Sequence, residues 1–213
     1  MKVLLQIYKR CFIIAKNFIH YNMTKRIVII NGSLRSKGNT DTIIDSFIGG
    51  TYKKAVVKQF TLRDMNIQGC KGCMYCFKNE SCSIKDDMTE IHNELQKADL
   101  ILLASPSYWW GVTGIAKTFI DRLFLYYPEN NKQLIQGKNI LQFITMRVNA
   151  EQHGEEAFKN ETDPHLLISS HVFKKLGLNL IDTVFFSNLY QKNDAKNHTK
   201  HLKSAFELGR KLA

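Results

Sequence analysis

The stretch Arg26-Ile27-Val28-Ile29-Ile30 leads directly into the loop Asn31-Gly32-Ser33-Leu34-Arg35-Ser36-Lys37-Gly38-Asn39-Thr40. A buried strand that ends in a loop of small polar residues, just before an amphipathic segment, directs several backbone N–H groups at one point. Such an arrangement binds phosphate. The stretch therefore predicts a strand, a phosphate loop and a helix, the opening unit of a parallel α/β sheet.

The composition of this loop narrows the ligand. A Walker A loop ends in Gly-Lys-Ser/Thr and a dinucleotide fingerprint has the form G-x-G-x-x-G, whereas this loop ends in Gly38-Asn39-Thr40. Hydroxyls and amides, with Arg35 as the fixed cation, suit a terminal phosphate monoester bound without Mg²⁺. The loop therefore predicts flavin mononucleotide (FMN).

Length and composition favour one globular domain. The 213 residues contain no segment that reads as a linker, and 44% hydrophobic with 23% charged residues is an ordinary globular composition. The formal charge of +11 is scattered, with no basic helix interleaved with aromatic residues, so we expect no nucleic-acid partner. A basic surface also attracts anionic cofactors.

Residues 1–22 differ from the rest because they are basic and contain no acidic residue. They are too short and too charged to span a bilayer, and no signal-type cleavage site precedes Met23. We interpret them as an N-terminal extension, an upstream start that is not translated, with amphipathic membrane attachment as the alternative. Residues 23–213 are then the FMN-binding domain of a cytoplasmic protein without a membrane partner.

Strands and helices alternate along the chain. Apolar runs predict strands over 26–30, 55–62, 99–104, 139–146 and 178–186, and helical periodicity predicts helices over 40–48, 86–98, 114–125, 165–176 and 194–212. Gly49-Gly50 reads as a helix C-cap, and the polar segment 151–163 as a loop. Five such units predict a flavodoxin-like three-layer α/β fold: a five-stranded parallel sheet of order 2-1-3-4-5 with helices on both faces. Its ligand binds between the first and third strands.

The loop after the third strand is strongly aromatic. It reads Ser105-Pro106-Ser107-Tyr108-Trp109-Trp110-Gly111. Aromatic residues at a strand end can cover the core, but three successive large rings cannot all point inward. The pattern favours a loop whose rings flank a flat cofactor.

Four of the five cysteines form the pattern Cys70-x2-Cys73-x2-Cys76-x5-Cys82. A cytosolic parallel α/β protein has little use for a disulfide, and zinc sites more often pair two C-x2-C knuckles across a longer gap. The first three cysteines, C-x2-C-x2-C, resemble the first three ligands of a ferredoxin [4Fe-4S] site, although the spacing to the fourth cysteine differs. Two interpretations stay open: an iron-sulfur cluster, or a reduced loop that packs on a neighbouring subunit.

These motifs resemble the flavodoxin-like NADPH-dependent FMN reductases, and most closely their iron-sulfur flavoprotein branch. The resemblance rests on Gly32-Ser33-x-Arg35-x-x-Gly38-Asn39-Thr40, Cys70-x-Gly72-Cys73-x-x-Cys76 with Cys82, Asp86-Asp87-Met88, Ser105-Pro106-x-Tyr108 and Lys117-x-Phe119-Ile120-Asp121-Arg122.

The resemblance implies a set of site residues. The FMN phosphate would contact Ser33, Arg35, Gly38, Asn39 and Thr40. The ribityl chain and ring would contact Pro106, Ser107, Tyr108, Trp109 and Gly111, with Thr145 and Met146 also near the flavin. A cluster would bind Cys70, Cys73, Cys76 and Cys82. The chain departs from the family pattern at Leu34 and Trp109-Trp110, and the pair Asp121-Arg122 is expected to be a structural ion pair.

The resemblance also implies an activity. NAD(P)H would be the cosubstrate that passes a hydride to FMN. The acceptor would be a quinone, a nitro or azo compound, free flavin, an iron-sulfur centre or a ferredoxin-like carrier. We name no protein acid or base, because the cofactor supplies the chemistry, and we expect a homodimer or homotetramer. Two alternatives are an iron-sulfur electron carrier between proteins and a cysteine-rich regulator or metal-binding module with an empty phosphate loop.

Overall fold

The computed structural model describes residues 24–213. The expectations for residues 1–22, as an extension or a membrane attachment, lie outside the described residues. Within residues 24–213, none of the helices combines the length and apolarity that a bilayer crossing requires.

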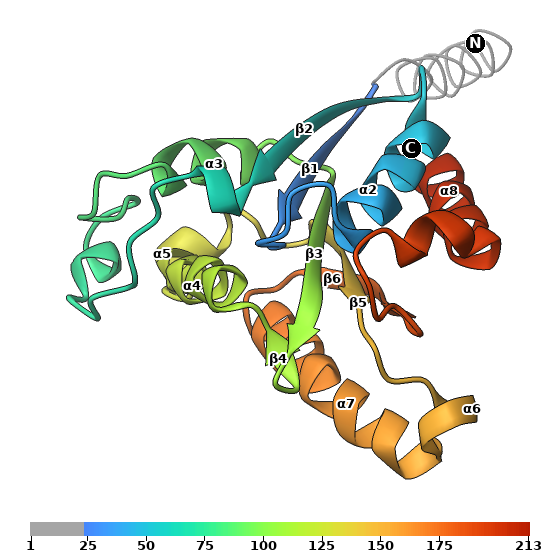
Figure 1. The fold of residues 1–213 in the computed structure, drawn as a ribbon. Helices are drawn as coiled ribbons and strands as arrows, with labels where there is room; N and C mark the ends of the chain where they lie inside the picture. Colours follow the sequence, from blue (N-terminus) through green and yellow to red (C-terminus); the bar gives the residue numbers. More distant parts are fainter. Residues whose placement is uncertain (1–23) are drawn as a thin grey trace, which may run out of the picture.

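A parallel sheet forms the centre of the molecule (Figure 1). Its strands are β1 (Lys25–Asn31), β2 (Ala55–Thr61), β3 (Leu100–Tyr108), β5 (Asn139–Thr145) and β6 (Asn179–Phe186). They lie in the order β2-β1-β3-β5-β6, which confirms the predicted arrangement of five parallel strands. The two-residue strand β4 (Gly111–Val112), which the sequence did not predict, pairs antiparallel with the end of β3.

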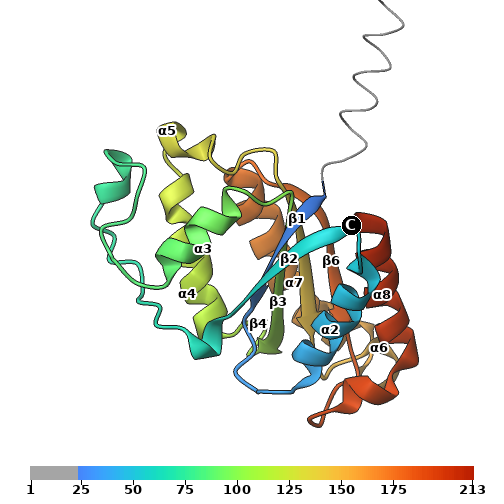
Figure 2. The same cartoon turned by 90° about the horizontal axis from the view of Figure 1, so that it is seen from above.

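Helices cover both faces of this sheet (Figures 1 and 2). On one face lie α2 (Asn39–Thr51) and α8 (Thr199–Leu212), packed on Ile27 and Ile29 of β1. On the other lie α3 (Met88–Leu95), α4 (Gly114–Arg122) and the π-helical segment Ile168–Phe173, packed on Val28 and Ile30. The alternating side chains of β1 therefore serve two cores, as a continuously apolar parallel strand requires.

Short helical elements complete the chain. They are α5 (Glu129–Lys132) and the 3₁₀ turns Leu62–Asp64, Tyr75–Phe77, Leu123–Tyr126 and Asp194–Asn197.

The loop predicted over 151–163 is wrong, because this segment is helical. It forms α6 (Ala150–His153) and α7 (Glu155–Leu167), separated at Gly154, whose φ of +85° breaks the helix. The Asn149 side chain caps α6 by accepting the Gln152 N–H at 2.8 Å. Both helices extend beyond the carboxyl edge of the sheet (Figure 1), so they lack the apolar stripe from which a buried helix is recognised.

The C-cap predicted at Gly49-Gly50 is also wrong. Helix α2 continues through both glycines to Thr51. A Cβ on Gly50 would collide with the Phe206 carbonyl of α8, and a Cβ on Gly209 would collide with the Phe47 carbonyl of α2. These two glycines are needed because the backbones of α2 and α8 cross in contact.

This crossing predicts a contrast between neighbouring glycines. Gly50→Ala and Gly209→Ala should each lower the free energy of unfolding by about 1 to 3 kcal/mol, since each overpacks the α2–α8 contact. Gly49→Ala is the matched control, because its Cβ would lie 3.7 Å from the Phe206 ring, an ordinary contact. Urea unfolding measures all three, and equal losses at Gly49 and Gly50 would contradict the packing argument.

Candidate functional site

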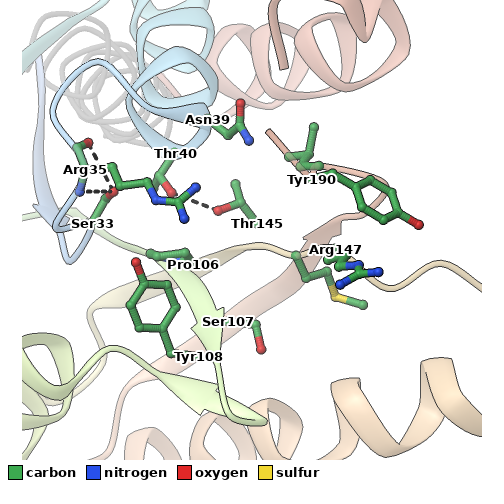
Figure 3. A pocket seen from close by; sticks show the side chains of 12 residues that line it. Ser33, Arg35, Asn39, Thr40, Pro106, Ser107, Tyr108, Thr145, Arg147 and Tyr190 are labelled. Atoms are coloured by element: carbon green, nitrogen blue, oxygen red, sulfur yellow. Dashed lines mark hydrogen bonds between the residues drawn. The ribbon is translucent and has the colours of Figure 1, made fainter. Parts of the chain in front are cut away.

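A pocket lies at the carboxyl edge of the sheet, between the loops that follow β1 and β3. Strand β1 pairs with β2 on one side and with β3 on the other. The connections that follow β1 and β3 therefore run to opposite faces of the sheet. The cavity measures about 170 Å³ (Figure 3). Its lining residues are Ser33, Arg35, Asn39, Thr40, Pro106, Ser107, Tyr108, Thr145, Met146, Arg147, Leu189 and Tyr190.

The start of α2 faces this pocket. Within the helix, the Thr42 N–H donates to the Gly38 carbonyl at 3.1 Å, so the N–H groups of the preceding turn lie at the open helix end. That end carries the positive pole of the helix dipole. Gly38 itself does not line the pocket, because it caps α2 and its N–H donates to Asp41 Oδ2 at 3.3 Å.

Hydrogen bonds of Asn31, at the start of the phosphate loop, and of Arg63, from outside it, hold the loop in place. Asn31 Oδ1 accepts the Ser33 N–H at 3.0 Å, and Asn31 Nδ2 donates to Asp41 Oδ1 at 2.6 Å. Arg63, from the turn after β2, donates to the Ser33 carbonyl at 3.1 Å and pairs with Asp41 at 3.2 Å. The sequence analysis missed Arg63, because its role depends on how β2 pairs with β1.

The polar side chains of the α2 end of the pocket differ in whether they are free to meet a ligand. Thr40 and Thr145 join their hydroxyls at 2.8 Å, and the exposed Arg35 reaches over them in Figure 3. Asn39 is committed elsewhere: its amide donates to the Gln191 carbonyl at 2.8 Å and accepts the Ala195 N–H at 3.1 Å. Arg35 is therefore a cation placed to meet an anionic ligand here, and Asn39 anchors the loop before α8.

The tip of the aromatic loop is a tight hairpin turn that does not line the pocket. Trp109 and Trp110 make the two-residue turn between β3 and β4, both with positive φ (+49° and +58°). Bulky residues rarely adopt this conformation, which usually takes Asn-Gly in such turns. Trp109 is 89% exposed and Trp110 50%, so the core interpretation of these rings is wrong. Neither Trp109 nor Gly111 lines the pocket, whereas Pro106, Ser107 and Tyr108 do.

Ser107 connects the pocket wall to α7. Its hydroxyl donates to Glu161 Oε1, and a carboxylate oxygen only accepts, so Ser107 Oγ accepts from His165 Nε2 at 3.0 Å. In Figure 3 the Ser107 hydroxyl points away from the cavity centre. His165 is fully buried, and this burial lowers its pKa to about 4.

Three lining residues were not predicted from the sequence: Arg147, Leu189 and Tyr190. The Arg147 guanidinium lies over the Tyr190 ring, 4.9 Å from its centre, and the Tyr190 hydroxyl donates to Gln152 Oε1 at 2.7 Å. Helix α6 is thereby tied to the pocket rim. No local motif marks these residues, since they come from loops after β5 and β6 that meet only in the fold.

The cysteine loop lies away from this pocket. It runs between β2 and α3, on the face of the sheet opposite α2 and α8 (Figures 1 and 2). All four predicted cysteines are free thiols and line one hollow together with Arg122. Within residues 24–213, no group of three or more His, Cys, Asp or Glu side chains stands in metal-binding geometry.

The thiols of this loop differ in environment. The Ser83 hydroxyl, 3.2 Å from Cys73 Sγ, lowers the pKa of the exposed Cys73, and the Tyr75 N–H acts in the same direction. Burial raises the pKa of Cys76. The reactive thiolate form is therefore favoured at the open side of the loop.

The ion pair predicted between Asp121 and Arg122 is wrong. Asp121 pairs with Lys117 at 2.6 Å on the exposed side of α4, because these residues are four apart and share a face. Arg122 points the other way and pairs with Asp86 at 2.7 Å, with both side chains almost completely buried. Against the cost of burial, hydrogen bonds from Arg122 lower the pKa of Asp86.

The sheet order and the pocket at its switch point define the flavodoxin-like class. Within that class, the model of the family described as NADPH-dependent FMN reductase matches residues 25–164, more than half of the chain. The chain belongs to this family, which confirms the resemblance seen in the sequence.

Similar proteins carry related names. An iron-sulfur flavoprotein of Methanocaldococcus jannaschii is 33% identical over 98 residues, 46% of this chain and 51% of that protein. One from Archaeoglobus fulgidus is 37% identical over 98 residues, covering 46% and 48%. The chain thus spans about half the length of the curated relatives it matches.

Solved structures agree with the fold. An NAD(P)H:quinone oxidoreductase from Methanothermobacter marburgensis superposes with a TM-score of 0.69 at 14% identity, over 89% of this chain and 98% of that one. An azoreductase from Bacillus anthracis gives 0.66 at 15% identity, over 88% of this chain and 99% of that one. At these identities the likeness concerns the fold.

The buried His165 predicts a loss of stability in acid. The unfolded chain binds a proton at this residue below pH 6.5, whereas the folded chain resists protonation down to about pH 4. Stability is therefore complete above pH 6.5 and is lost as the pH falls toward 4. His165→Gln should reduce the loss of unfolding free energy between pH 7 and pH 5 by about 2 kcal/mol.

Urea unfolding at the two pH values measures this difference. The exposed His171 provides the control variant His171→Gln, which should keep the wild-type difference. Equal acid losses in wild type and His165→Gln would contradict the assignment of His165 as a histidine that folds in its neutral form.

Proposed function

We propose that this chain is an FMN-dependent NAD(P)H oxidoreductase that binds FMN in the pocket at the carboxyl edge. One observation carries the proposal. All predicted cofactor residues except Gly38, Trp109 and Gly111 come from three separate segments and line this one pocket. Membership of the NADPH-dependent FMN reductase family supports the same cofactor and cosubstrate.

The pocket suggests how FMN is oriented. The phosphate would meet Arg35, Ser33 and the N-terminus of α2, where N–H groups and a positive charge coincide. The ribityl chain and ring would follow Pro106 and Thr145 toward the hairpin. Because about 170 Å³ is less than a ligand of this size usually fills, the ring would rest on the rim.

The exposed rim favours an assembly. Trp109 and Trp110 stand uncovered beside the place proposed for the ring. Large exposed aromatic side chains at a site usually have a partner. We propose that a second copy of the chain covers them, in a homodimer or homotetramer.

When bound, FMN would supply the redox chemistry, which is hydride transfer from NAD(P)H followed by electron transfer to an acceptor. The chain's residues bind and orient: Arg35 and the start of α2 hold the anionic end, and the hairpin limits access to the ring. We propose a small-molecule acceptor such as a quinone, a nitro or azo compound or free flavin. Fold neighbours named as quinone oxidoreductase and azoreductase support this class.

The cysteine loop fits an iron-sulfur cluster in its chemistry. It offers four free thiols around one hollow, with a guanidinium beside them, although the thiols are not drawn together into a ligand set. We propose that Cys70, Cys73, Cys76 and Cys82 hold a [4Fe-4S] cluster, which would supply one-electron transfer. Relatives named iron-sulfur flavoprotein support the proposal, and free thiols suit the cytoplasm.

A carrier role between proteins is the second candidate. The placement of the cysteine loop on the molecular surface favours it, because Cys70 and Cys73 are exposed to a docking protein. Slow oxidation of NAD(P)H combined with rapid reduction by a ferredoxin-like protein would select the carrier role over the reductase.

Anaerobic purification of the full chain tests both proposals at once. Absorption spectra and assays for iron, sulfide and flavin on one sample, with light scattering for its mass, give the composition. Flavin with about four irons per chain would establish an iron-sulfur flavoprotein. Flavin without iron would leave an FMN-dependent oxidoreductase and refute the cluster, and absence of flavin would refute the pocket assignment.

Removing the phosphate contacts should release FMN. Ser33→Ala combined with Arg35→Ala deletes a hydroxyl and a cation, and charge-assisted hydrogen bonds contribute about 1.5 to 3 kcal/mol each. We expect the FMN dissociation constant to rise at least about a hundredfold. Fluorescence titration of the metal-free protein measures it.

The matched control also removes one hydroxyl and one cation from this loop, at positions outside the pocket. Ser36 and Lys37 are exposed and do not line the pocket, and Asn tolerates the positive φ of 53° at Lys37. Ser36→Ala/Lys37→Asn should bind FMN as wild type does. Full flavin occupancy in Ser33→Ala/Arg35→Ala would refute the assignment of the phosphate site.

The two sites should separate by mutation. Cys73→Ser should remove the iron while FMN stays bound, because the hollow and the pocket share no lining residue. Iron and flavin assays on the same preparation measure this, with Cys11→Ser, which changes the fifth cysteine, as the control. Joint loss of iron and FMN would contradict the independence of the sites.

A further inference from the structure

The cysteine loop is closed at its base by paired backbone and side-chain contacts. Asp87 donates its N–H to the Asn66 carbonyl at 3.2 Å, and the Asn66 N–H donates to Asp87 Oδ2 at 2.7 Å. Next to them, the Gln68 N–H donates to Asp86 Oδ2 at 2.8 Å. The ends of the loop are therefore fixed side by side, while Cys70 and Cys73 stay exposed.

Arg122 of α4 joins this base to the rest of the molecule. Its Nη1 donates to Asp86 Oδ2 and to the Gln68 carbonyl, each at 2.7 Å, and its Nη2 donates to Asp86 Oδ1 at 3.0 Å. The pair is buried, with 1% of the Arg122 side chain and none of the Asp86 side chain exposed. Water therefore screens its charges little.

The same guanidinium also reaches a cysteine. Arg122 Nη2 donates to Cys82 Sγ at 3.6 Å, and both line the hollow. Asp86 accepts the N–H groups of Gln68 and Met88, which fix its carboxylate against the guanidinium. The ion pair thus presents its positive end to Cys82. A guanidinium keeps its charge in proteins, so the Arg122 end of the pair is positive.

We infer that Arg122 is a positioning residue for the proposed cluster: it holds Cys82 at the base of the loop and raises the reduction potential of the bound cluster. This inference rests on the proposed iron-sulfur function.

Simple electrostatics gives the direction of the effect. A cluster ligated by thiolates becomes more negative on reduction, so a nearby positive charge stabilises the reduced form more than the oxidised form. Hydrogen bonds to ligand sulfurs act in the same direction, and the protein sets cluster potentials through such contacts. An exposed lysine at the rim of the loop would have a weaker effect, because solvent screens it.

Two variants of the full chain test the inference. Asp86→Asn/Arg122→Met removes both buried charges together, which avoids leaving a buried carboxylate unpaired. Arg122→Lys keeps the charge and the fold but loses the fork that reaches Asp86, Gln68 and Cys82 together. The matched control is Lys117→Met/Asp121→Asn, which removes the exposed ion pair of the same helix.

The readouts are iron content and the midpoint potential of the cluster, followed by EPR in an anaerobic redox titration. Asp86→Asn/Arg122→Met should lower the ratio of reduced to oxidised cluster at a fixed potential about tenfold, a shift of about 59 mV for one electron. Arg122→Lys should shift it less in the same direction, and the control should match wild type.

The outcomes separate this inference from the function on which it rests. Normal iron with an unchanged potential in both Arg122 variants would overturn the inference alone. Loss of iron in a folded, flavin-binding Arg122→Lys protein would support the positioning of Cys82. A wild-type chain without iron would refute the proposed cluster, and the inference with it.

Discussion

The pairing of β1 with strands on both of its sides is the constraint on which the rest of the structure depends. Because β2 and β3 flank β1 in parallel, the chain must cross to opposite sides, and the loops after β1 and β3 separate at the carboxyl edge. This separation opens a crevice at the edge of the sheet, and the phosphate loop and the aromatic hairpin lie on its two sides. Arg63 then stabilises the first loop, and the hydrogen bonds between Ser107 and α7 stabilise the second.

Much of this arrangement could be predicted from the sequence, because it follows from local patterns. Buried parallel strands are continuous apolar runs, and a phosphate loop has a recognisable composition. The segment 151–163 could not be read in the same way, since a helix beyond the sheet edge needs no apolar stripe. Gly49-Gly50 has the local pattern of a helix C-cap. Its actual role is to allow close contact between α2 and α8, which only the tertiary structure shows. Arg147 and Tyr190 belong to the pocket through tertiary structure alone.

The two candidate sites depend on different parts of the architecture. The pocket is built on the sheet edge, so its walls share the rigidity of β1, β3 and β5. The cysteine loop is held at its base by the buried ion pair between Asp86 and Arg122 of α4, and farther along by Asn131, whose side-chain amide donates to the Cys76 carbonyl at 2.8 Å. A buried pair of this kind contributes little net stability but fixes geometry, since losing either partner leaves an unpaired charge. The position of the cysteine loop thus depends on polar contacts as well as on packing, since Cys76 packs on the core and the Phe77 ring lies 5.8 Å from that of Phe124.

The hairpin turn has a spectroscopic consequence. Trp109 and Trp110 are the two tryptophans of the whole chain, and their rings lie 5.5 Å apart at the rim of the pocket. Indole fluorescence of this protein therefore arises from one spot instead of averaging over the molecule. Solvent exposure makes that emission sensitive to any molecule that covers the rim. The chain carries a built-in optical reporter beside its pocket, without a label or a substitution.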